Sequence, residues 1–371
     1  MKIAIDARVL EKGITGIGRY LEDLLQGLPL LDNKNEYYLF SYRNLNIEPG
    51  YYKNISTGKP FLPDKIFSAF WLNFILPKYL NTLSVDLFFT PNQLLPIRKI
   101  GAKKIITVHD VAHKENKLYH PLFYRIYNHI LLSLSLSRSD GIITISKFSK
   151  ESICTHYKVE PNKIVIVSRT ATNKFCKKQI GIERIEKLKK KFDLPEMFIL
   201  YVGMIERRKN INGILKISDL LRKKNLPLEF VLIGKRGHGF AEIHKNILRR
   251  SNVHYLENVN DNDLVDIYNI AFAFLFPSFF EGFGLPPLEA MQTGLPVLVS
   301  NRASLPEVVG EAGIVKEPED YEGFADEITK LYKNMDYQMY RQNKSIERSS
   351  KFDYLKSIEA FLKIINISAT D

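Results

Sequence analysis

Short apolar segments alternate with stretches of helical periodicity along this chain, and the alternation occurs twice. Strands that alternate with helices are typical of parallel β-sheets, because a parallel connection needs a crossover that is usually a helix. The sequence therefore predicts an α/β protein with two doubly wound units in tandem. The expected strands lie at residues 2–5, 38–41, 87–89, 105–108, 141–145 and 164–167 in the first series and at 198–202, 229–233, 253–256, 273–276 and 297–299 in the second.

A polar, lysine-rich segment at residues 173–193 separates the two series and indicates a domain boundary. We expect an N-terminal domain over residues 1–175 and a C-terminal domain over residues 190–345. The length of 371 residues is large for one hydrophobic core, which agrees with two domains. Residues 340–367 have helical periodicity with one apolar face. One arrangement that this face allows is a C-terminal helix over residues 346–371 that packs back onto the N-terminal domain.

The net charge of +12 is compatible with several classes of anionic partner. Lysine and arginine are spread along the chain without a helix-turn-helix, zinc-binding or RNA-binding signature, so nucleic acid is not expected as a partner. Anionic lipid head groups and phosphorylated substrates explain a basic surface equally well. The only cysteines are Cys154 and Cys176, and Asp6 and Arg8 interrupt the apolar start before the core of a signal peptide can form. These features predict a cytoplasmic protein, and they are also compatible with a protein that lies at the inner face of the membrane.

The segment at residues 274–297 carries the clearest chemical signal. It predicts a buried strand, a loop with Gly282 and Gly284, and a helix that starts at the prolines that follow. Glycine lets the backbone approach a ligand closely, and the N-terminal end of a helix binds phosphates and hydroxyls. Glu281 lies in the loop and Glu289 within the helix, so the two carboxylates are expected to contact different ends of one extended ligand. In the competing interpretation, Glu281 only caps the helix and Glu289 lies at the surface.

This segment and several others together resemble the retaining GT-B glycosyltransferases of family 4, also called group 1 glycosyltransferases. The resemblance extends over nearly the whole chain and implies two Rossmann-like domains that face each other across a cleft. The other matching segments are Thr-Gly-Ile-Gly-Arg-Tyr at 15–20, Thr-Val-His-Asp at 107–110, Ile-Ser-Lys-Phe-Ser at 145–149, Tyr-Val-Gly-Met-Ile-Glu-Arg-Arg-Lys-Asn at 201–210 and Ser-Leu-Pro-Glu-Val-Val-Gly at 304–310.

The resemblance implies that the N-terminal domain binds the acceptor and that the C-terminal domain binds a nucleotide-sugar donor. Glu281 would contact hydroxyls of the transferred sugar, and Glu289 would contact the ribose. Arg208 and Lys209 match the basic pair that neutralises the diphosphate, on which negative charge builds during transfer. This chain has Met204 where many members have arginine, so the resemblance does not assign a separate role to each basic residue of this segment. The donor-binding residues implied are Gly16, Gly18, Gly203, Arg208, Lys209, Glu281, Gly282, Phe283, Gly284, Leu285 and Glu289, and the catalytic residues implied are His109, Glu281, Arg208 and Lys209.

The N-terminal domain contributes three of these residues. Gly16 and Gly18 match the family's glycine loop after the first strand, and their spacing departs from the fingerprint of a dinucleotide site. His109 ends a predicted buried strand, at the edge where open α/β sheets bind ligands. The resemblance implies that His109 touches the donor sugar. The competing interpretation is a core histidine with a satisfied hydrogen bond.

The resemblance also implies transfer with retention, in which a donor phosphate oxygen accepts the proton of the acceptor. No carboxylate can be assigned as the nucleophile of a double displacement. Neither a metal ion nor a cofactor is expected. Asp261 and Asp263 form the Asp-x-Asp pattern of metal-using transferases with another fold, but they directly precede a helical stretch, so helix capping is expected.

Donor and acceptor are the least constrained features. The Thr-Gly-Ile-Gly-Arg-Tyr segment resembles that of mannosyltransferases of O-antigen and exopolysaccharide assembly, which favours GDP-mannose as the donor and a glycan or polyprenyl-diphosphate-linked acceptor. UDP-glucose and UDP-GlcNAc are compatible with the same residues. Aromatic side chains with basic neighbours at 61–80 and 119–136 suit peripheral contact with a membrane, although core-facing helices explain them too. A nucleotide-sugar epimerase and a non-catalytic binding protein are the alternative functions.

Overall fold

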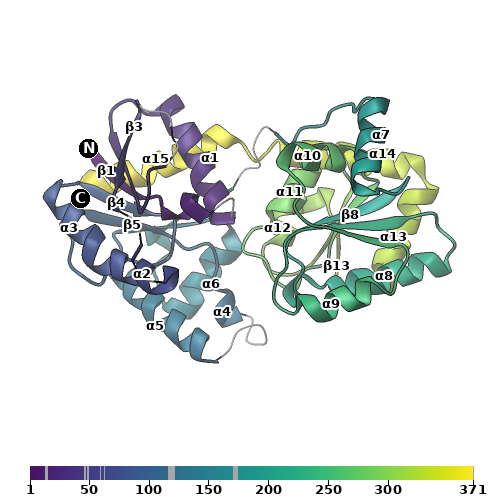
Figure 1. Cartoon of the computed structure of the whole chain (residues 1–371), viewed down its shortest axis with the longest axis horizontal. Helices are drawn as coiled ribbons and strands as arrows, with labels where there is room; N and C mark the ends of the chain where they lie inside the picture. Colours follow the sequence, from purple (N-terminus) through teal and green to yellow (C-terminus); the bar gives the residue numbers. More distant parts are fainter. Residues whose placement is uncertain are drawn as a thin grey trace. The chain divides into compact units, whose positions relative to one another are not determined.

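Two regions of the chain each build a parallel β-sheet with helices packed on its faces (Figure 1). The computed structural model describes residues 1–12, 16–45, 47, 50–58, 60–61, 63–115, 122–169 and 174–370. The first unit comprises residues 1–169 together with 354–371, and the second comprises residues 170–353. Each unit is described separately below.

The first sheet has the strand order β3-β2-β1-β4-β5-β6-β7 among the described residues, and its strand pairs are parallel. The order reverses between β1 and β4, and such a switch point is where open α/β sheets bind ligands at the carboxyl ends of their strands. The strands are β1 (Lys2–Asp6), β2 (Glu36–Ser41), β3 (Tyr52–Ser56), β4 (Leu87–Thr90), β5 (Lys103–Thr107), β6 (Gly141–Thr144) and β7 (Ile164–Ile166).

The second sheet has the order β10-β9-β8-β11-β12-β13 among the described residues, which is the 3-2-1-4-5-6 order of a Rossmann fold. Its pairs are also parallel, and its switch point lies between β8 and β11. The strands are β8 (Phe198–Val202), β9 (Glu229–Ile233), β10 (Val253–Leu256), β11 (Ala273–Phe276), β12 (Val297–Ser300) and β13 (Ile314–Lys316).

Two strands, β3 and β13, are not predicted from the sequence, and both are edge strands. An edge strand pairs on one side only and stays partly exposed, so it lacks the continuous apolar run of a buried parallel strand. The residues of β3 are all half-buried or exposed, and β13 has only three residues. Both therefore resemble loop segments in sequence.

Helices cover the two faces of the first sheet and enclose one hydrophobic cluster on each face. One cluster joins the sheet to α1 and α15, and the other joins it to α2, α3, α5 and α6. The helix from α2 to α3 is continuous, with a π-helical turn, η2, in its middle. The helices are η1 (Arg8–Lys12), α1 (Gly16–Leu31), α2 (Asp64–Phe70), η2 (Trp71–Ile75), α3 (Leu76–Thr82), α4 (Ala112–Glu115), α5 (Leu122–Arg138), α6 (Lys147–Tyr157), η4 (Pro161–Lys163) and α15 (Tyr354–Thr370).

The second unit has its own set of helices, and none of the helices within the described ranges of the chain is both long and apolar enough to cross a bilayer. The helices of this unit are α7 (Ile182–Phe192), η5 (Arg207–Lys209), α8 (Ile211–Lys223), α9 (Phe240–Ile247), α10 (Asp261–Ile270), α11 (Leu285–Gln292), α12 (Leu305–Val309), η6 (Gly310–Ala312), α13 (Tyr321–Lys333) and α14 (Met335–Ser349).

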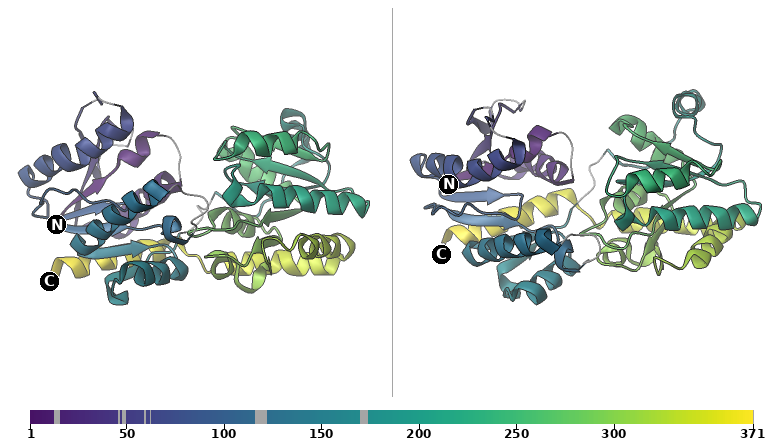
Figure 2. Two further views of the ribbon diagram at one scale, coloured as in Figure 1. Left: turned by 90° about the horizontal axis from the view of Figure 1, so that it is seen from below. Right: turned by 60° about the horizontal axis from the view of Figure 1, so that its bottom comes forward.

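The single helix predicted over residues 340–367 is wrong, because the chain forms two helices there. α14 belongs to the second unit, whereas α15 lies along the sheet of the first (Figure 2). Phe361 of α15 packs on Phe89 with a ring distance of 4.8 Å. Ile358 fills the space beside Gly27 of α1, where a Cβ atom would lie 2.5 Å from its Cγ1 atom. The apolar face recognised in the sequence is therefore the face with which α15 covers the first sheet.

Candidate functional site

The loop between β11 and α11 lies at the switch point of the second sheet. Gly284 precedes the helix with φ +112°, and α11 begins at Leu285 with proline in its first turn, close to the predicted start. A Cβ atom on Gly284 would lie 2.8 Å from the side chain of Leu305. Because both the left-handed backbone and the close neighbour exclude a side chain, glycine is required at this position.

Lys209 and Glu281 form a buried ion pair at this edge. Their Nζ and Oε1 atoms are 2.5 Å apart, and each residue is only 8% exposed. The hydroxyl of Ser278 donates a hydrogen bond of 2.7 Å to the same carboxylate oxygen. The ammonium group also lies 5.0 Å from the centre of the Phe276 ring, at the end of β11. Residues after β8 and β11, the two strands of the switch point, therefore build one charged centre.

Arg208 extends this centre with a second cation. It donates from Nη1 to the carbonyl oxygen of Phe280 at 2.5 Å and from Nη2 to Glu206 at 2.6 Å. Its Nη1 atom is also 3.5 Å from Oε2 of Glu281. The guanidinium is thereby held in the loop between β8 and α8, and the two cations are balanced by two carboxylates.

The surroundings of Glu281 favour its charged form. Burial alone would raise the pKa of its carboxyl group, but Lys209 and Arg208, together with the hydrogen bond from Ser278, outweigh burial and lower the pKa. Burial lowers the pKa of Lys209, and the attraction of Glu281 opposes this effect. The carboxylate therefore stays ionised, as an acceptor of hydrogen bonds only.

Glu289 is 2% exposed and accepts a hydrogen bond of 3.0 Å from the hydroxyl of Tyr268 in α10. The Tyr268 ring is fully buried and is packed edge-on by Phe175, with a ring distance of 5.5 Å. The interpretation of Glu289 as a surface residue and Glu281 as a helix cap is therefore wrong, because both carboxylates are buried and the N-cap residue is Gly284.

Gly203 follows β8 at the same edge. A Cβ atom on it would lie 2.8 Å from the hydroxyl of Tyr201, and a Cβ atom on Gly234, after the neighbouring strand β9, would lie 1.9 Å from the carbonyl oxygen of Gly203. Two backbone segments thus touch at the strand ends. The next residue, Met204, is 46% exposed.

Asp261 and Asp263 form ion pairs instead of a cap. The N-cap residue of α10 is Asn260, whose side chain accepts from the backbone N–H of Asp263. The Asp263 carboxylate binds Arg184 at 2.7 Å and Lys191 at 2.6 Å, which ties α7 to α10. Lys174 lies 3.3 Å from Asp261. The expectation that these aspartates cap the helix is therefore wrong, because the cap is Asn260, the residue before Asp261.

The first unit holds the remaining predicted residues. His109 makes a hydrogen bond of 2.9 Å through Nε2 to the carbonyl oxygen of Pro91, which follows β4, and packs edge-on against Tyr20 at 5.2 Å. Burial of the imidazole, and then the charge of Arg169, lower the pKa of His109 to about 4. The ring is therefore neutral near pH 7, and it lies at the switch point of the first sheet.

Gly16 and Gly18 belong to the first turn of α1, not to a loop as expected. Gly18 is buried, and a Cβ atom on Gly16 would lie 3.9 Å from Nη1 of Arg169. Residues 13–15 of the same motif lie outside the described residues.

The structure thus gathers the predicted residues into two clusters, one in each unit. Three residues that form hydrogen bonds with the predicted residues of the second unit are not predicted from the sequence: Glu206, Ser278 and Tyr268. Glu206 and Ser278 lie within three positions of a predicted residue, which is a usable signal. Tyr268 carries no such signal, because its contact with Glu289 depends on the packing of α10 against α11.

Comparison with known proteins assigns both halves of the chain. A family model described as glycosyltransferase family 4 matches residues 14–170, and one described as glycosyl transferases group 1 matches residues 183–348. O-antigen chain mannosyltransferase B of Escherichia coli is 28% identical over 370 residues, which cover 95% of this chain and 96% of that protein. The serotype-specific mannosyltransferase WbdA of Escherichia coli is 30% identical over 289 residues, and this match spans only 35% of that longer protein.

The fold is also found among solved structures. A glycosyltransferase from Rickettsia africae ESF-5 superposes with a TM-score of 0.73 over 99% of this chain and 97% of its own, at 18% identity. At this identity the similarity concerns the fold alone. The predicted GT-B class, with two Rossmann-like α/β units, is confirmed.

Proposed function

Because this chain belongs to the family 4, or group 1, glycosyltransferases, we propose that it transfers mannose from GDP-mannose to a lipid-linked or cell-surface glycan in O-antigen assembly. The observation that carries this proposal is the similarity to an O-antigen chain mannosyltransferase over nearly the full length of both chains. The proposed place of action is the cytoplasm, at the inner face of the membrane, because an excess of basic residues suits an anionic lipid surface.

The charged centre of the second unit supplies the proposed donor site. Arg208 and Lys209 neutralise the diphosphate, and Glu281 accepts hydrogen bonds from hydroxyls of the sugar. The buried position of this centre strengthens its interaction with the charge that develops on the leaving diphosphate. The N-terminal end of α11, with the backbone of Gly282, Phe283, Gly284 and Leu285, binds the diphosphate and sugar. Gly203 leaves room for the donor beside them.

Glu289 is the proposed partner of the ribose. Its side chain is already oriented by the hydroxyl of Tyr268, and a carboxylate has several lone pairs, so it can accept from Tyr268 and from ribose hydroxyls together. A hydroxyl that reaches this buried carboxylate forms a charge-assisted hydrogen bond, which is stronger than a neutral one.

In the first unit, His109 is the proposed contact to the donor sugar, with Gly16 and Gly18 beside the donor phosphate. The lowered pKa of His109 keeps the imidazole neutral, so it donates or accepts a hydrogen bond without adding charge. We propose transfer with retention and without a metal ion. The acceptor hydroxyl oxygen forms a bond to the anomeric carbon on the face from which the diphosphate leaves, the C–O bond to the diphosphate breaks, and a phosphate oxygen of the leaving diphosphate takes the proton of the acceptor.

A transfer assay tests this proposal. The purified chain is incubated with labelled GDP-mannose, UDP-glucose or UDP-GlcNAc and a farnesyl-diphosphate-linked glycan acceptor, with and without EDTA. We expect incorporation from GDP-mannose alone, unchanged by EDTA, with the product in the donor's anomeric configuration by NMR. Incorporation should be lost in Glu281→Gln and kept in Glu317→Gln, a half-exposed carboxylate paired with Arg302. Incorporation from a UDP-sugar alone would overturn the donor assignment, and an inverted product would overturn the mechanism.

A further inference from the structure

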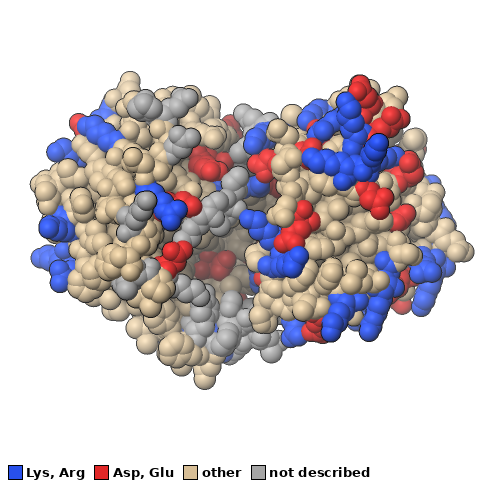
Figure 3. All heavy atoms as spheres, in the orientation of Figure 1, with Lys and Arg blue, Asp and Glu red and all other residues tan. Residues whose placement is uncertain are grey.

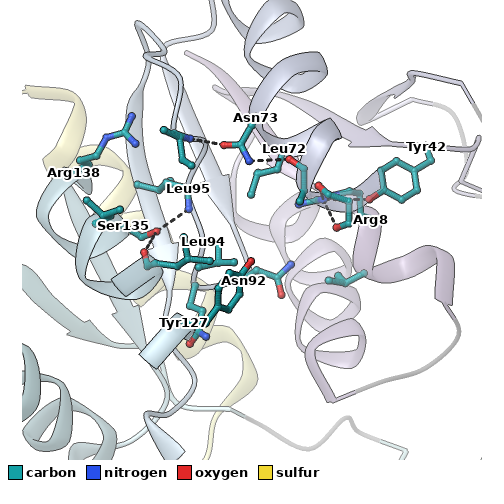
Figure 4. A pocket seen from close by; sticks show the side chains of 17 residues that line it. Arg8, Tyr42, Leu72, Asn73, Asn92, Leu94, Leu95, Tyr127, Ser135 and Arg138 are labelled. Atoms are coloured by element: carbon teal, nitrogen blue, oxygen red, sulfur yellow. Dashed lines mark hydrogen bonds between the residues drawn. The ribbon is translucent and has the colours of Figure 1, made fainter. Parts of the chain in front are cut away.

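The first unit contains a cavity of about 670 Å³ between the α2–η2 helix and α5 (Figure 4). This volume falls in the range of roughly 300–1,000 Å³ that is typical of sites for small molecules. Its floor is formed by the loop that follows β4. The apolar residues of its lining include Leu72, Leu94, Leu95, Leu131 and Leu134.

Two polar side chains of the wall are bound to the wall itself. Asn73 donates to the carbonyl oxygen of Ala69 and accepts from the backbone N–H of Ile97 at 2.7 Å, and Ser135 accepts from the N–H of Leu95 at 3.0 Å (Figure 4). Asn73 and Ser135 are thereby engaged, whereas a sugar site offers polar groups that converge on the ligand. This part of the wall therefore suits a hydrocarbon better than a glycan.

Arg8 is a further polar group of the wall, and it is also engaged. It forms two hydrogen bonds with Asp6, of 2.8 and 2.6 Å, and donates to the hydroxyl of Ser68 at 2.8 Å. Its guanidinium lies 4.3 Å from the centre of the Trp71 ring. Arg8 thereby joins the carboxyl end of β1 to α2 at one side of the cavity.

One end of the cavity lies beside the edge of the sheet where His109 is found. Asn92 and Gln93 line the cavity and directly follow Pro91, whose carbonyl oxygen binds the imidazole. Figure 4 shows Arg8 and Arg138 on opposite sides of the cavity, with Leu72, Leu94 and Leu95 between them. The end at this edge is thus polar, whereas leucine side chains line the part between the two arginines.

The surface of the helices around the cavity is also apolar. Phe74 of η2 is 47% exposed, and Tyr127 and Leu134 of α5 are 50% and 47% exposed. Arg98 places its guanidinium 4.6 Å from the centre of the Phe74 ring. Much of the face of the first unit seen in Figure 3 has no charged side chains, whereas lysine and arginine are interspersed with acidic residues on the second. Exposed aromatic residues with adjacent cations are typical of surfaces that contact anionic lipid.

We propose that this cavity binds the hydrocarbon chain of a polyprenyl-diphosphate-linked acceptor. The chain enters between the α2–η2 helix and α5, and the phosphate and its sugar emerge beside Asn92, toward His109. This assignment rests on the proposed function, because it gives the lipid-linked acceptor its binding site. It accounts for an apolar cavity that begins at the sheet edge carrying a predicted catalytic residue and continues into an exposed apolar surface.

Trp71 makes the proposal measurable in the full chain, because it is the only tryptophan and it packs against Arg8 in the cavity wall. The purified protein is titrated with farnesyl phosphate, and inorganic phosphate serves as the control for an anion without a chain. We expect a saturable change in tryptophan fluorescence with farnesyl phosphate and none with inorganic phosphate.

Two variants of α5 test the location. Leu134→Glu places a charge in the cavity, and Ile130→Glu places one on the same helix outside it, where Ile130 is 53% exposed. Because both positions are half-exposed, both variants should fold, which circular dichroism checks. We expect Leu134→Glu to weaken farnesyl phosphate binding by roughly tenfold or more, since a carboxylate beside a hydrocarbon must lose its hydration, and Ile130→Glu to leave it unchanged.

The proposal is overturned by an absence of saturable binding, by equal binding of inorganic phosphate, or by equal effects of the two variants. These outcomes are separate from a failure of the proposed function. Mannose transfer to a water-soluble glycan without farnesyl phosphate binding would remove only the cavity assignment. Farnesyl phosphate binding without any sugar transfer would remove only the enzymatic proposal.

Discussion

The Nζ atom of Lys209 and the Oε1 atom of Glu281 are 2.5 Å apart, although 72 positions separate the two residues in the sequence. Both side chains are almost fully buried. A buried charge that loses its partner is much less stable than the intact pair, because the remaining charge has neither water nor a counter-ion. The pair therefore links the integrity of the proposed donor site to the stability of the second unit.

We predict that Glu281→Gln lowers the free energy of unfolding of the second unit by about 3–5 kcal/mol, the usual cost of breaking a buried ion pair. Lys209 would then be buried with only an amide beside it. Scanning calorimetry measures the change. Glycosyl transfer should also be lost, because the carboxylate that is proposed to bind the sugar is absent.

The double variant Lys209→Met/Glu281→Gln separates the two effects. Removal of both charges should recover most of the stability lost in Glu281→Gln, since replacement of both members of a buried pair is often close to neutral. Transfer should stay absent. If the double variant regained activity along with stability, the pair would be structural only.

The Tyr268 hydroxyl should control donor binding through Glu289. We predict that Tyr268→Phe raises KM for the donor by roughly tenfold at most, because Glu289 loses a hydrogen bond that orients it and ordering a side chain on binding costs about 0.5–1.5 kcal/mol. The ring packing against Phe175 is kept in this variant. We expect kcat to change little, because the ribose is far from the bond that breaks.

A donor analogue provides the control. GDP should lose affinity for Tyr268→Phe in a calorimetric titration, whereas the 2′,3′-dideoxy form should bind the variant and the unchanged protein equally. An equal loss for both nucleotides would show that the hydroxyl acts on the fold and not on the ribose site.

Local sequence patterns predict most of this architecture. The buried strands β8 and β11 are continuous apolar runs, and Glu281 and Glu289 are recognisable because glycine and proline fix the turn between them. The partners of these carboxylates cannot be predicted from local patterns. Lys209 approaches Glu281 only because β8 and β11 are neighbours in the sheet, and no local pattern encodes that pairing.

Boundaries that depend on packing are also difficult to predict. The periodicity of residues 340–367 is helical throughout, yet the helix is interrupted between α14 and α15. In this interruption, Phe352 packs against Phe283 with a ring distance of 5.9 Å. The cavity between α2–η2 and α5 is beyond sequence reasoning for the same reason. Its wall depends on contacts such as Asn73 to Ile97, which join distant segments.

His109 should have a pKa well below that of an ordinary histidine. Burial, together with the charge of Arg169, lowers its pKa from 6.5 to about 4, so its imidazole should stay neutral while exposed histidines become protonated. NMR of the histidine ring protons measures the midpoint. The unfolded chain binds this proton near pH 6.5 and the folded chain only near pH 4, so this residue's contribution to stability is complete above pH 6.5 and is lost as the pH falls toward 4.

Arg169→Met is the matched test of the cause. It should raise the pKa of His109 only in part, because burial, the larger cause, remains. A midpoint near 6.5 in the unchanged protein would contradict the buried environment of the imidazole.

Gly284 should be the position in the donor loop that least tolerates a side chain. Gly284→Ala forces an alanine to φ +112° and places its Cβ atom 2.8 Å from Leu305. A non-glycine residue in such a conformation costs about 1–3 kcal/mol, so we expect a lower melting temperature for the second unit and weaker binding of GDP. Gly181→Ala is the control, because Gly181 belongs to the same unit and a Cβ atom there meets nothing within 4 Å. If Gly284→Ala matched Gly181→Ala in stability and in GDP affinity, the loop would have to move freely, and the rigid N-terminal end of α11 could not be the diphosphate site.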